Sequence, residues 1–174
     1  MSWIHPLLTA IGDASLAAAA GYAVLSLVAV LRWRHQSAAA SGAQAPVTVL
    51  KPLCGAEPGL YEHLRSFCRQ HYPQFQIVFG VDDPADPALV SVQRLVSEFP
   101  ALEIDVVINP QQRGSNRKIS NLISMLARAR YDVLVIADSD VFVGPDYLTR
   151  VTAPLLDTRV GLVTCLYHDV PTAR

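Results

Sequence analysis

Between residues 47 and 167, short apolar runs rich in β-branched residues alternate with stretches of helical periodicity. This alternation restricts the fold more than any other feature of the sequence. The runs with strand character are VTVLK (47–51), FQIVFGV (75–81), LEIDVVI (102–108), DVLVIAD (132–138) and VGLVTCLY (160–167). Strands separated by helices predict right-handed crossovers and a mostly parallel sheet, so the expected fold class is α/β.

The segments between these runs are expected to form amphipathic helices that cover the sheet. They span residues 60–70, 88–99 and 117–130, and another helix is expected to begin near Pro145. The apolar stripe of the first helix is Leu60, Leu64, Phe67 and Cys68. The stripe of the third helix includes Ile119, Leu122, Ile123 and Leu126.

Ahead of this region lies an apolar run at residues 14–31, which contains no charged residue. As a helix it would be about 27 Å long, close to the thickness of the hydrocarbon core of a bilayer. Arg32, Arg34 and His35 follow at once, whereas a secretory signal carries its positive charge ahead of the apolar run. The run therefore predicts a transmembrane anchor with the amino terminus outside and the rest in the cytoplasm. The alternative is an alanine-rich core helix of a soluble domain.

The expected organisation is an N-terminal transmembrane anchor at 1–35, a linker at 36–46 that is small, polar and without pattern, and a domain at 47–174. The formal net charge of −1 gives no reason to expect nucleic acid as a partner. The three cysteines are far apart and form no CxxC pair, so neither a disulfide framework nor a zinc site is indicated; buried or half-buried free thiols are expected.

Polar residues follow three of the expected strands at the point where each strand ends. Strand one ends at Lys51-Pro52, strand two at Asp82-Asp83 and strand four at Asp138-Ser139-Asp140. In a parallel sheet, ligands bind outside the carboxyl ends of the strands, so these loops predict a site. In an extended segment residues i and i+2 point to the same side, so Asp138 and Asp140 are expected to face one volume.

Carboxylates in this position suit a divalent cation, Mg²⁺ or Mn²⁺, that bridges to the phosphates of a nucleotide. The alternative for Asp138 and Asp140 is a strand end or a helix cap. Asp82 and Asp83 could accept hydrogen bonds from a uracil imide or from ribose hydroxyls, or could simply start a helix at an Asp-Asp-Pro turn. Lys118 could reach a diphosphate at a helix amino terminus, or could be a solvated surface lysine. No GxGxxG follows the first strand, and no Ser/His/Asp or Cys/His arrangement is present.

Two longer stretches carry a family resemblance: residues 47–87, beginning VTVLKPLCGAEPG, and residues 116–151, NRKISNLISMLARARYDVLVIADSDVFVGPDYLTRV. Together with VGLVTCLY they resemble the ceramide glucosyltransferase family of GT-A glycosyltransferases, including its bacterial hopanoid-biosynthesis branch. The resemblance covers about residues 46 to 170 and extends to the membrane helix before them.

The resemblance implies a membrane-anchored inverting enzyme with a GT-A, Rossmann-like sheet on the cytoplasmic side of a bacterial inner membrane. It would transfer glucose or N-acetylglucosamine from a UDP-sugar to a hydroxyl of a membrane lipid, a hopanoid or a ceramide. By this similarity Asp82 or Asp83 contacts the nucleoside, Asp138 lies near the ribose and diphosphate, and Asp140 is the main metal ligand. The substrate-binding set it implies is Lys51, Asp82, Asp83, Asn116, Lys118, Asn121 and Asp138, with Asp140 and Asp138 at the metal.

Family members continue beyond the equivalent of Arg174 with a third aspartate, which is the general base, then a Q/R-x-x-R-W motif and further membrane helices. Asp169, in YHDVPTAR, does not resemble that aspartate. The expectation is therefore that the C-terminal part of the domain is missing and that no catalytic residue lies within this sequence.

Alternatives remain at this stage. Within the same superfold they are a polyprenyl-phosphate sugar synthase and a processive polysaccharide synthase. From another class, a catalytically inactive, membrane-tethered nucleotide-binding or interaction module is possible. A phosphotransfer receiver domain is disfavoured, because its first strand should be followed by an acidic pair and here Lys51-Pro52 stands in that place.

Overall fold

The structure is a computed structural model that describes residues 4–34 and 44–165. The chain divides into two compact units between residues 39 and 40, and each is described by itself. Most of the expected linker at 36–46 lies outside the described residues.

The first unit is one helix, α1 (Ile4–Arg34). Its segment Leu8–Arg32, 25 residues, is long and apolar enough to cross a membrane, judged by length and composition. The core helix of a soluble domain would be mostly buried, and none of this window is. These properties match the expected apolar anchor and extend it beyond residues 14–31.

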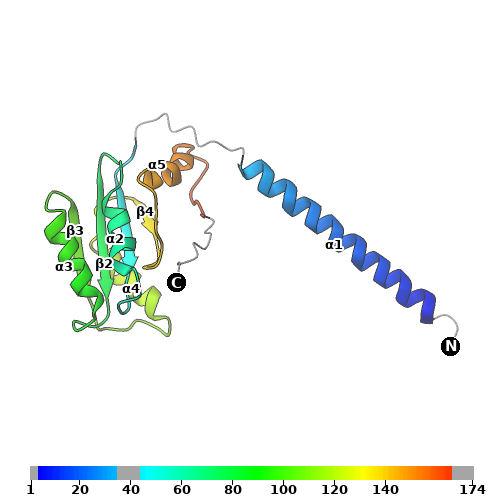
Figure 1. Ribbon diagram of the computed structural model, residues 1–174, viewed down its shortest axis with the longest axis horizontal. Coiled ribbons are helices and arrows are strands. Elements are labelled where there is room, and N and C mark those ends of the chain that lie inside the picture. The colour runs from blue at the N-terminus through cyan, green and yellow to red at the C-terminus, as the bar shows by residue number, and fades with distance from the viewer. Residues whose placement is uncertain (1–3, 35–43, 166–174) are drawn as a thin grey trace. The chain divides into compact units, whose positions relative to one another are not determined.

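The second unit is built on a four-stranded parallel sheet of order β3-β2-β1-β4 (Figure 1). The strands are β1 (Val47–Pro52), β2 (Phe75–Val81), β3 (Glu103–Ile108) and β4 (Val133–Ile136). In the register, Val49 of β1 lies opposite Ile77 of β2 and Val135 of β4. The predicted α/β class and parallel sheet are confirmed.

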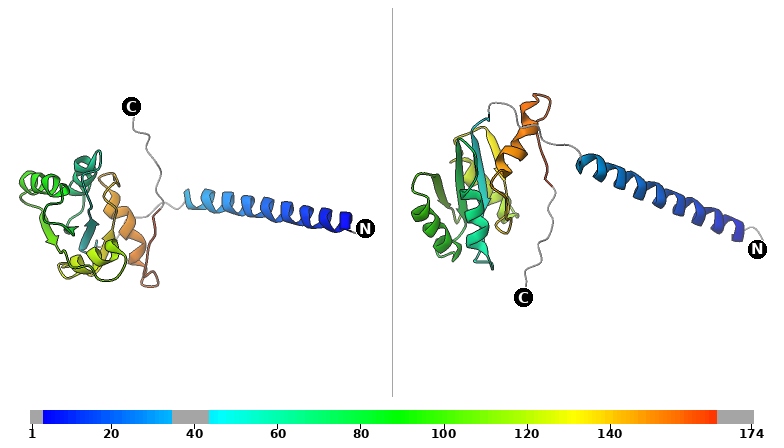
Figure 2. Two further views of the ribbon diagram at one scale, coloured as in Figure 1. Left: turned by 90° about the horizontal axis from the view of Figure 1, so that it is seen from below. Right: turned by 45° about the horizontal axis from the view of Figure 1, so that its top comes forward.

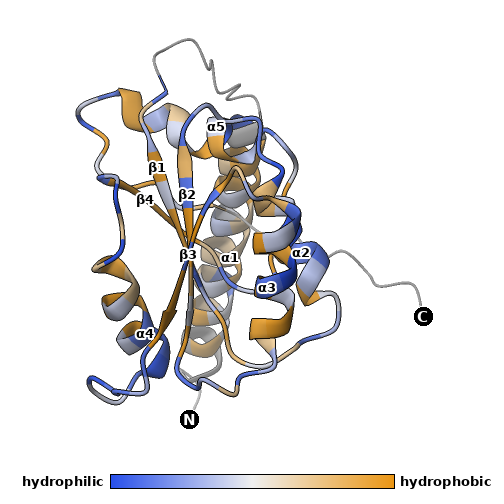
Figure 3. Ribbon diagram, turned by 90° about the vertical axis from the view of Figure 1, so that its left-hand side faces the viewer, coloured by the Kyte–Doolittle hydropathy of each residue, from blue (hydrophilic) through white to orange (hydrophobic). Residues whose placement is uncertain are grey.

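Helices cover both faces of the sheet (Figures 2 and 3). The helices α2 (Leu60–Cys68) and α3 (Ala88–Glu98) lie on one face, and α4 (Arg117–Leu126) lies on the other. After β4 come a short helix α5 (Tyr147–Thr152) and a 3₁₀ turn at Ala153–Leu156. The helix expected from Pro145 begins two residues later, after Asp146.

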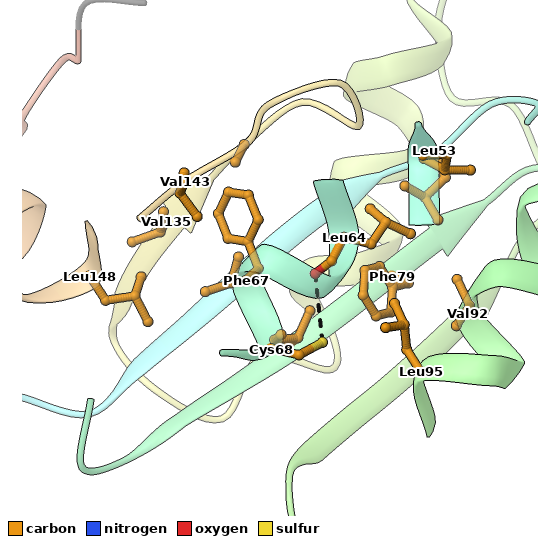
Figure 4. Packing of buried hydrophobic residues seen from close by; sticks show 14 of the residues in the cluster. Leu53, Leu64, Phe67, Cys68, Phe79, Val92, Leu95, Val135, Val143 and Leu148 are labelled. Atoms are coloured by element: carbon orange, nitrogen blue, oxygen red, sulfur yellow. Dashed lines mark hydrogen bonds between the residues drawn. The ribbon is translucent and has the colours of Figure 1, made fainter. Parts of the chain in front are cut away.

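The main hydrophobic core lies between the sheet and the α2–α3 face (Figure 4). Phe67 of α2 is fully buried and packs edge-on against Tyr147, with the ring centroids 5.6 Å apart. All four residues of the predicted α2 stripe are buried: Leu60, Leu64, Phe67 and Cys68. Of the cysteines, Cys68 is buried, but Cys54 is exposed, against the expectation of sheltered thiols.

A buried glutamine joins the sheet to the chain that follows α4. Gln76 of β2 accepts from the Thr48 hydroxyl at 3.0 Å and from the Arg130 amide at 3.0 Å, and it donates to the Arg128 carbonyl at 2.9 Å. Because these partners would be left unsatisfied without it, Gln76 fixes the position at which the chain enters β4.

The predicted apolar stripe of α4 is wrong except at Leu122, which is partly buried and packs against the second hydrophobic cluster of the sheet. Ser120, Asn121 and Met125 are the buried residues of this helix, whereas Ile119, Ile123 and Leu126 are 50%, 42% and 50% exposed. The reason is the close approach of α4 to Gly80, whose carbonyl accepts a hydrogen bond from the Asn121 amide at 2.8 Å. That carbonyl also accepts from the Leu53 amide at 2.8 Å, so the Asn121 amide is its second donor. Asn121 therefore faces the sheet, and the three apolar residues are turned aside.

The predicted fifth strand at 160–167 does not form over its described part. Residues 160–165 carry no strand pairing, and Leu162 is 81% exposed. An apolar β-branched run becomes a strand only where another strand completes its hydrogen bonds, so composition alone over-predicts strands here. Residues 166 and 167 lie outside the described part of the chain.

Candidate functional site

The carboxyl ends of the strands and the start of α4 meet at one edge of the sheet, at the lower end of the domain in Figure 1. Asp82 and Asp83 follow β2, Asn109 follows β3, and Asp138 comes two residues after β4. The first turn of α4 begins at Arg117. The predicted convergence of polar loops at this edge is therefore present.

The segment with the two carboxylates is a turn. Strand β4 ends at Ile136, Ser139 and Asp140 are turn residues, and the Val141 amide donates to the Asp138 carbonyl at 3.4 Å. The argument from alternation along an extended segment is therefore wrong, because the strand ends before the aspartates. Both aspartates are exposed.

Two neighbouring cations of α4 pair with carboxylates from two different loops. Arg117 Nε donates to Asp82 Oδ2 at 3.0 Å, and Lys118 Nζ donates to Asp138 Oδ1. The side chains of Arg117 and Lys118 are 63% and 50% exposed, so these ion pairs contribute little to stability. The positive charges and the helix amino terminus are therefore accessible to an anionic ligand at this edge.

A polar pocket of about 300 Å³ has the Arg117–Asp82 pair in its wall, whereas Lys118, Asp138 and Asp140 are not among the residues that line it. Its walls come from the loops after β2 and β3 and from the first turn of α4: Asp82, Asp83, Pro84, Asn109, Pro110, Gln111, Gln112, Arg117 and Ser120. Another cavity, apolar and of about 60 Å³, lies by Val133 at the opposite end of β4. The small cavity holds little more than a water molecule or two, so the polar pocket is the candidate ligand site.

Lys51, expected among the substrate-binding residues, is fully buried beneath the turn. Its Nζ donates to the Asp138 carbonyl at 2.8 Å and lies 3.6 Å from the centroid of the Phe67 ring. Burial lowers the pKa of Lys51 to about 7, and the nearby charges of Asp138 and Asp140 oppose that shift. Lys51 therefore contacts the aspartate turn from the core side and is closed off from solvent.

The two asparagines of the expected set have structural contacts. Asn116 caps α4 by accepting from the Ile119 amide at 3.1 Å. Asn121 is 5% exposed, donates to the Gly80 carbonyl, and has a buried Oδ1 with no hydrogen-bond partner among the described residues. Both residues hold the start of α4 at the site, and their direct contact with a ligand stays a prediction.

Several pocket residues were missed by the sequence reasoning. Arg117 adjoins Lys118 and could have been noticed as a second cation at a helix start. Asn109, Gln111 and Ser120 give no such signal: the Asn109 amide donates to the Ser124 hydroxyl, and the Ser120 hydroxyl accepts from the Arg113 amide at 2.7 Å. Their place in the wall depends on how the loop after β3 folds back over α4.

The carboxylates of the turn fit a metal that takes few protein ligands. Among the described residues, no three His, Cys, Asp or Glu side chains come together as a complete metal site. Lys118 forms an ion pair with the Asp138 carboxylate, whereas within residues 44–165 the Asp140 side chain makes no hydrogen bond or ion pair. One or two carboxylate oxygens completed by phosphate oxygens and water is the usual arrangement for Mg²⁺ bound with a nucleotide.

The sequence matches the family described as Glycosyl transferase family 21 over residues 13–173. The chain belongs to glycosyl transferase family 21. The resemblance to ceramide glucosyltransferases is thereby confirmed, while the hopanoid branch stays a prediction.

Curated relatives of this family 21 chain include ceramide glucosyltransferases from a nematode and from yeasts. The ceramide glucosyltransferase of Komagataella phaffii is 32% identical over 143 residues, which are 73% of this chain and 28% of that protein. Ceramide glucosyltransferase 1 of Caenorhabditis elegans is 30% identical over 119 residues, 68% of this chain and 26% of that protein. The family 21 chain thus spans about a quarter of the length of the curated relatives it matches.

Solved structures confirm the GT-A fold of the family 21 chain. The mannosyltransferase PcManGT from Pyrobaculum calidifontis, in complex with GDP-Man and Mn²⁺, has a TM-score of 0.71 and 26% identity, covering 91% of this chain and 47% of its own. TarS 1–349 of S. aureus in complex with UDP has a TM-score of 0.52 and 23% identity, covering 65% of this chain and 32% of its own, and supports the fold alone.

Proposed function

We propose that this chain is the donor-binding part of a membrane-anchored, inverting glycosyltransferase that moves glucose or N-acetylglucosamine from a UDP-sugar to a lipid hydroxyl. The observation that carries the proposal is the pairing of two adjacent α4 cations with carboxylates of two different loops, one pair of which, Arg117 with Asp82, lines a polar pocket. A sugar nucleotide has the matching parts: a polar base and ribose, and a diphosphate of concentrated negative charge.

The polar pocket is proposed to hold the nucleoside. Asp82 and Asp83 lie in its wall and offer acceptors for a uracil imide and for ribose hydroxyls. Arg117 and Lys118, at the amino terminus of α4, are proposed to exchange their exposed carboxylate partners for diphosphate oxygens. Asn116 and Asn121 contribute by holding that helix end in place.

Asp140 is proposed as the principal ligand of a divalent cation, Mg²⁺ or Mn²⁺, and Asp138 as the second. Asp140 is the freer of the two, since Asp138 already pairs with Lys118. The cation supplies a positive charge that stabilises the diphosphate as the glycosyl bond breaks. The mannosyltransferase similar to this chain was solved with GDP-Man and Mn²⁺, which supports metal dependence.

In the proposed reaction the acceptor oxygen attacks the anomeric carbon of the sugar from the side opposite the diphosphate. The bond from that carbon to the diphosphate oxygen breaks, UDP leaves, and a general base takes the hydroxyl proton. In this proposal the residues of this chain bind the donor, and no residue is assigned as the general base.

The acceptor is proposed to be a membrane lipid, a hopanoid or a ceramide. The apolar segment Leu8–Arg32 supports a membrane location, and the ceramide glucosyltransferases among the relatives support a lipid acceptor. Arg32 and Arg34 follow the apolar run, which favours a cytoplasmic domain, here on the inner membrane of a bacterium.

The test is calorimetric titration of UDP into the full chain in detergent micelles, with Mn²⁺ or with EDTA. We expect binding in Mn²⁺ that is at least tenfold tighter than in EDTA, and loss of that difference in Asp140→Ala. Asp132→Ala is the matched control, because Asp132 is an exposed aspartate at the other end of β4.

Equal affinity with and without Mn²⁺ would refute the metal assignment. A variant Asp140→Ala that binds like the unchanged protein would refute the residue assignment while leaving metal dependence intact. The alternative of a nucleotide-binding module without catalysis also predicts metal-dependent binding; transfer of sugar to a lipid by this chain would exclude that alternative.

A further inference from the structure

Both lysines of the chain contact the same residue. The sequence contains only Lys51 and Lys118, with arginine at every other basic position apart from histidine. Lys118 pairs with the Asp138 carboxylate from the solvent side, and Lys51 binds the Asp138 carbonyl from the core side. Asp138 is thus held at its side chain by one ammonium group and at its backbone by the other.

The setting of Lys51 is costly for an ammonium group. Its side chain is 0% exposed, and its contacts are one carbonyl oxygen at 2.8 Å and the face of the Phe67 ring at 3.6 Å. Water would offer three hydrogen bonds, so the exchange is unfavourable for a charged group. An apolar side chain of similar length would fill the same space without that cost.

Few other bonds hold the turn that Lys51 touches. Before it, the Ala137 amide donates to the Leu50 carbonyl at 3.2 Å; after it, the Val143 amide donates to the Ser66 hydroxyl at 3.2 Å. Within residues 44–165, the backbone of 138–142 makes only two further bonds, and both end on the Asp138 carbonyl: one from Lys51 and a longer one from Val141 at 3.4 Å. The Lys51 bond is therefore the shortest hydrogen bond to the backbone of the turn between its two anchors, and the Val141 side chain, packed against the core, is the other restraint.

We propose that Lys51 is a positioning residue: it fixes the turn that carries Asp138 and Asp140, and so sets metal-dependent nucleotide affinity without touching the nucleotide. The effect on nucleotide affinity rests on the proposed function, whereas the restraint on the turn rests on the geometry alone. Without the ammonium group, the turn samples arrangements in which Asp140 is not aligned with the phosphates, and part of the binding free energy is spent on ordering it.

The test is Lys51→Met in the full chain in detergent micelles, with three measurements. In EDTA, the melting temperature is expected to equal or exceed that of the unchanged protein. Hydrogen exchange at the three hydrogen-bonded amides in and beside the turn, those of Ala137, Val141 and Val143, is expected to quicken at least tenfold, while the amides of β1 and β2 stay protected. The affinity for UDP in Mn²⁺ is expected to fall at least tenfold. Lys51→Gln, which keeps a shorter N–H donor, serves as the second variant.

Thr48→Val is the matched control on the same strand. Thr48 is 0% exposed and its hydroxyl bonds to Gln76 and to the Tyr131 amide, away from the turn. It is expected to show the reverse pattern, with a lower melting temperature and unchanged UDP affinity. A residue with a purely structural role would behave like Thr48.

Unchanged exchange at the amides of Ala137, Val141 and Val143 in both Lys51 variants would overturn the proposal, whatever the ligand. Faster exchange with an unchanged affinity for UDP in Mn²⁺ would overturn the claim that Lys51 sets metal-dependent nucleotide affinity. If the unchanged protein shows no Mn²⁺ dependence, the proposed function fails, and the exchange measurement alone still decides whether Lys51 restrains the turn.

Discussion

Replacement of Gly80 by alanine tests the packing that brings α4 to the site. Gly80 lies in β2, and a Cβ atom there would stand 2.6 Å from Met125 Cγ and within contact of Asn121 Oδ1. Real Cβ atoms do not approach other atoms so closely, so the helix or its side chains must move. Met125 is fully buried and Asn121 is 5% exposed, so neither side chain has open space in which to move.

The cost has two parts. One added methyl group in a packed interior costs about 1–3 kcal/mol. Displacement of Asn121 weakens its 2.8 Å bond to the Gly80 carbonyl, which adds about 1 kcal/mol. The expected loss of unfolding free energy is therefore about 2–4 kcal/mol, or a fall in melting temperature on the order of 10 °C for a domain of this size.

The assay is thermal unfolding of the full chain in detergent micelles, followed by circular dichroism. The control is Gly144→Ala, because a Cβ atom at Gly144 would meet nothing within 4 Å and Gly144 has no positive φ. That control is expected to stay within about 0.5 kcal/mol of the unchanged protein. The double variant Gly80→Ala with Met125→Ala is expected to be more stable than the sum of the single effects predicts. Met125→Ala removes the side chain with which the new methyl group collides, and the methyl group fills part of the space that Met125 leaves.

A melting temperature of Gly80→Ala within 2 °C or so of the Gly144→Ala value would refute the reasoning. A well-packed interior does not accept a methyl group at no cost, so α4 would then have to lie farther from β2 than described.

Three further outcomes are expected. The folded-state pKa of Lys51 is lowered to about 7 from an ordinary 10.5, so the unfolded chain binds more protons, and in EDTA the unfolding free energy should rise by about 2 kcal/mol from pH 7 to 9 in urea titrations. Lys51→Met should abolish that rise. In the unchanged protein the rise should flatten above pH 9 and reverse near pH 10, because burial raises the pKa of Cys68 to about 12 and the unfolded thiol loses its proton first; a flat profile from pH 7 to 9 in the unchanged protein would contradict this. Gln76→Leu should lower the unfolding free energy by about 3 kcal/mol in the same titrations, because Thr48, Arg128 and Arg130 lose their hydrogen bonds to Gln76. A loss below about 1 kcal/mol would contradict the structural role given to these bonds. Arg117→Gln, at an exposed site, should leave stability within about 0.5 kcal/mol but weaken UDP binding about tenfold; unchanged binding would remove Arg117 from the diphosphate site.

The strands that pair with neighbours were predictable because their signal is local. The observed β1, β2 and β3 differ from the predicted ranges by at most one residue. The run at 160–167 has the same composition but no pairing over its described residues. Pairing depends on what lies alongside, which a single stretch of sequence does not contain.

The edge that carries the site was predictable from topology, but its contacts were not. Loops at the carboxyl ends of parallel strands must meet, whatever their sequence. The burial of Lys51 under Asp138, and the turning of Asn121 toward Gly80, depend on the depth to which each helix packs on the sheet. The stripe rule failed for α4 because Gly80 has no side chain, so the helix packs close to β2 and Asn121 and Met125 are the residues that face the strand.

Because the chain has only two lysines, chemical modification of lysine amines can report on the aspartate turn. The chain offers an amine-selective acylating reagent only two side-chain amines, and both contact Asp138. Lys118 is half exposed and should react at once, whereas Lys51 is sealed and should react only when the turn opens. The ratio of Lys51 modification to Lys118 modification therefore measures how often the turn opens. Slower modification of Lys118 alone would indicate a bound anion.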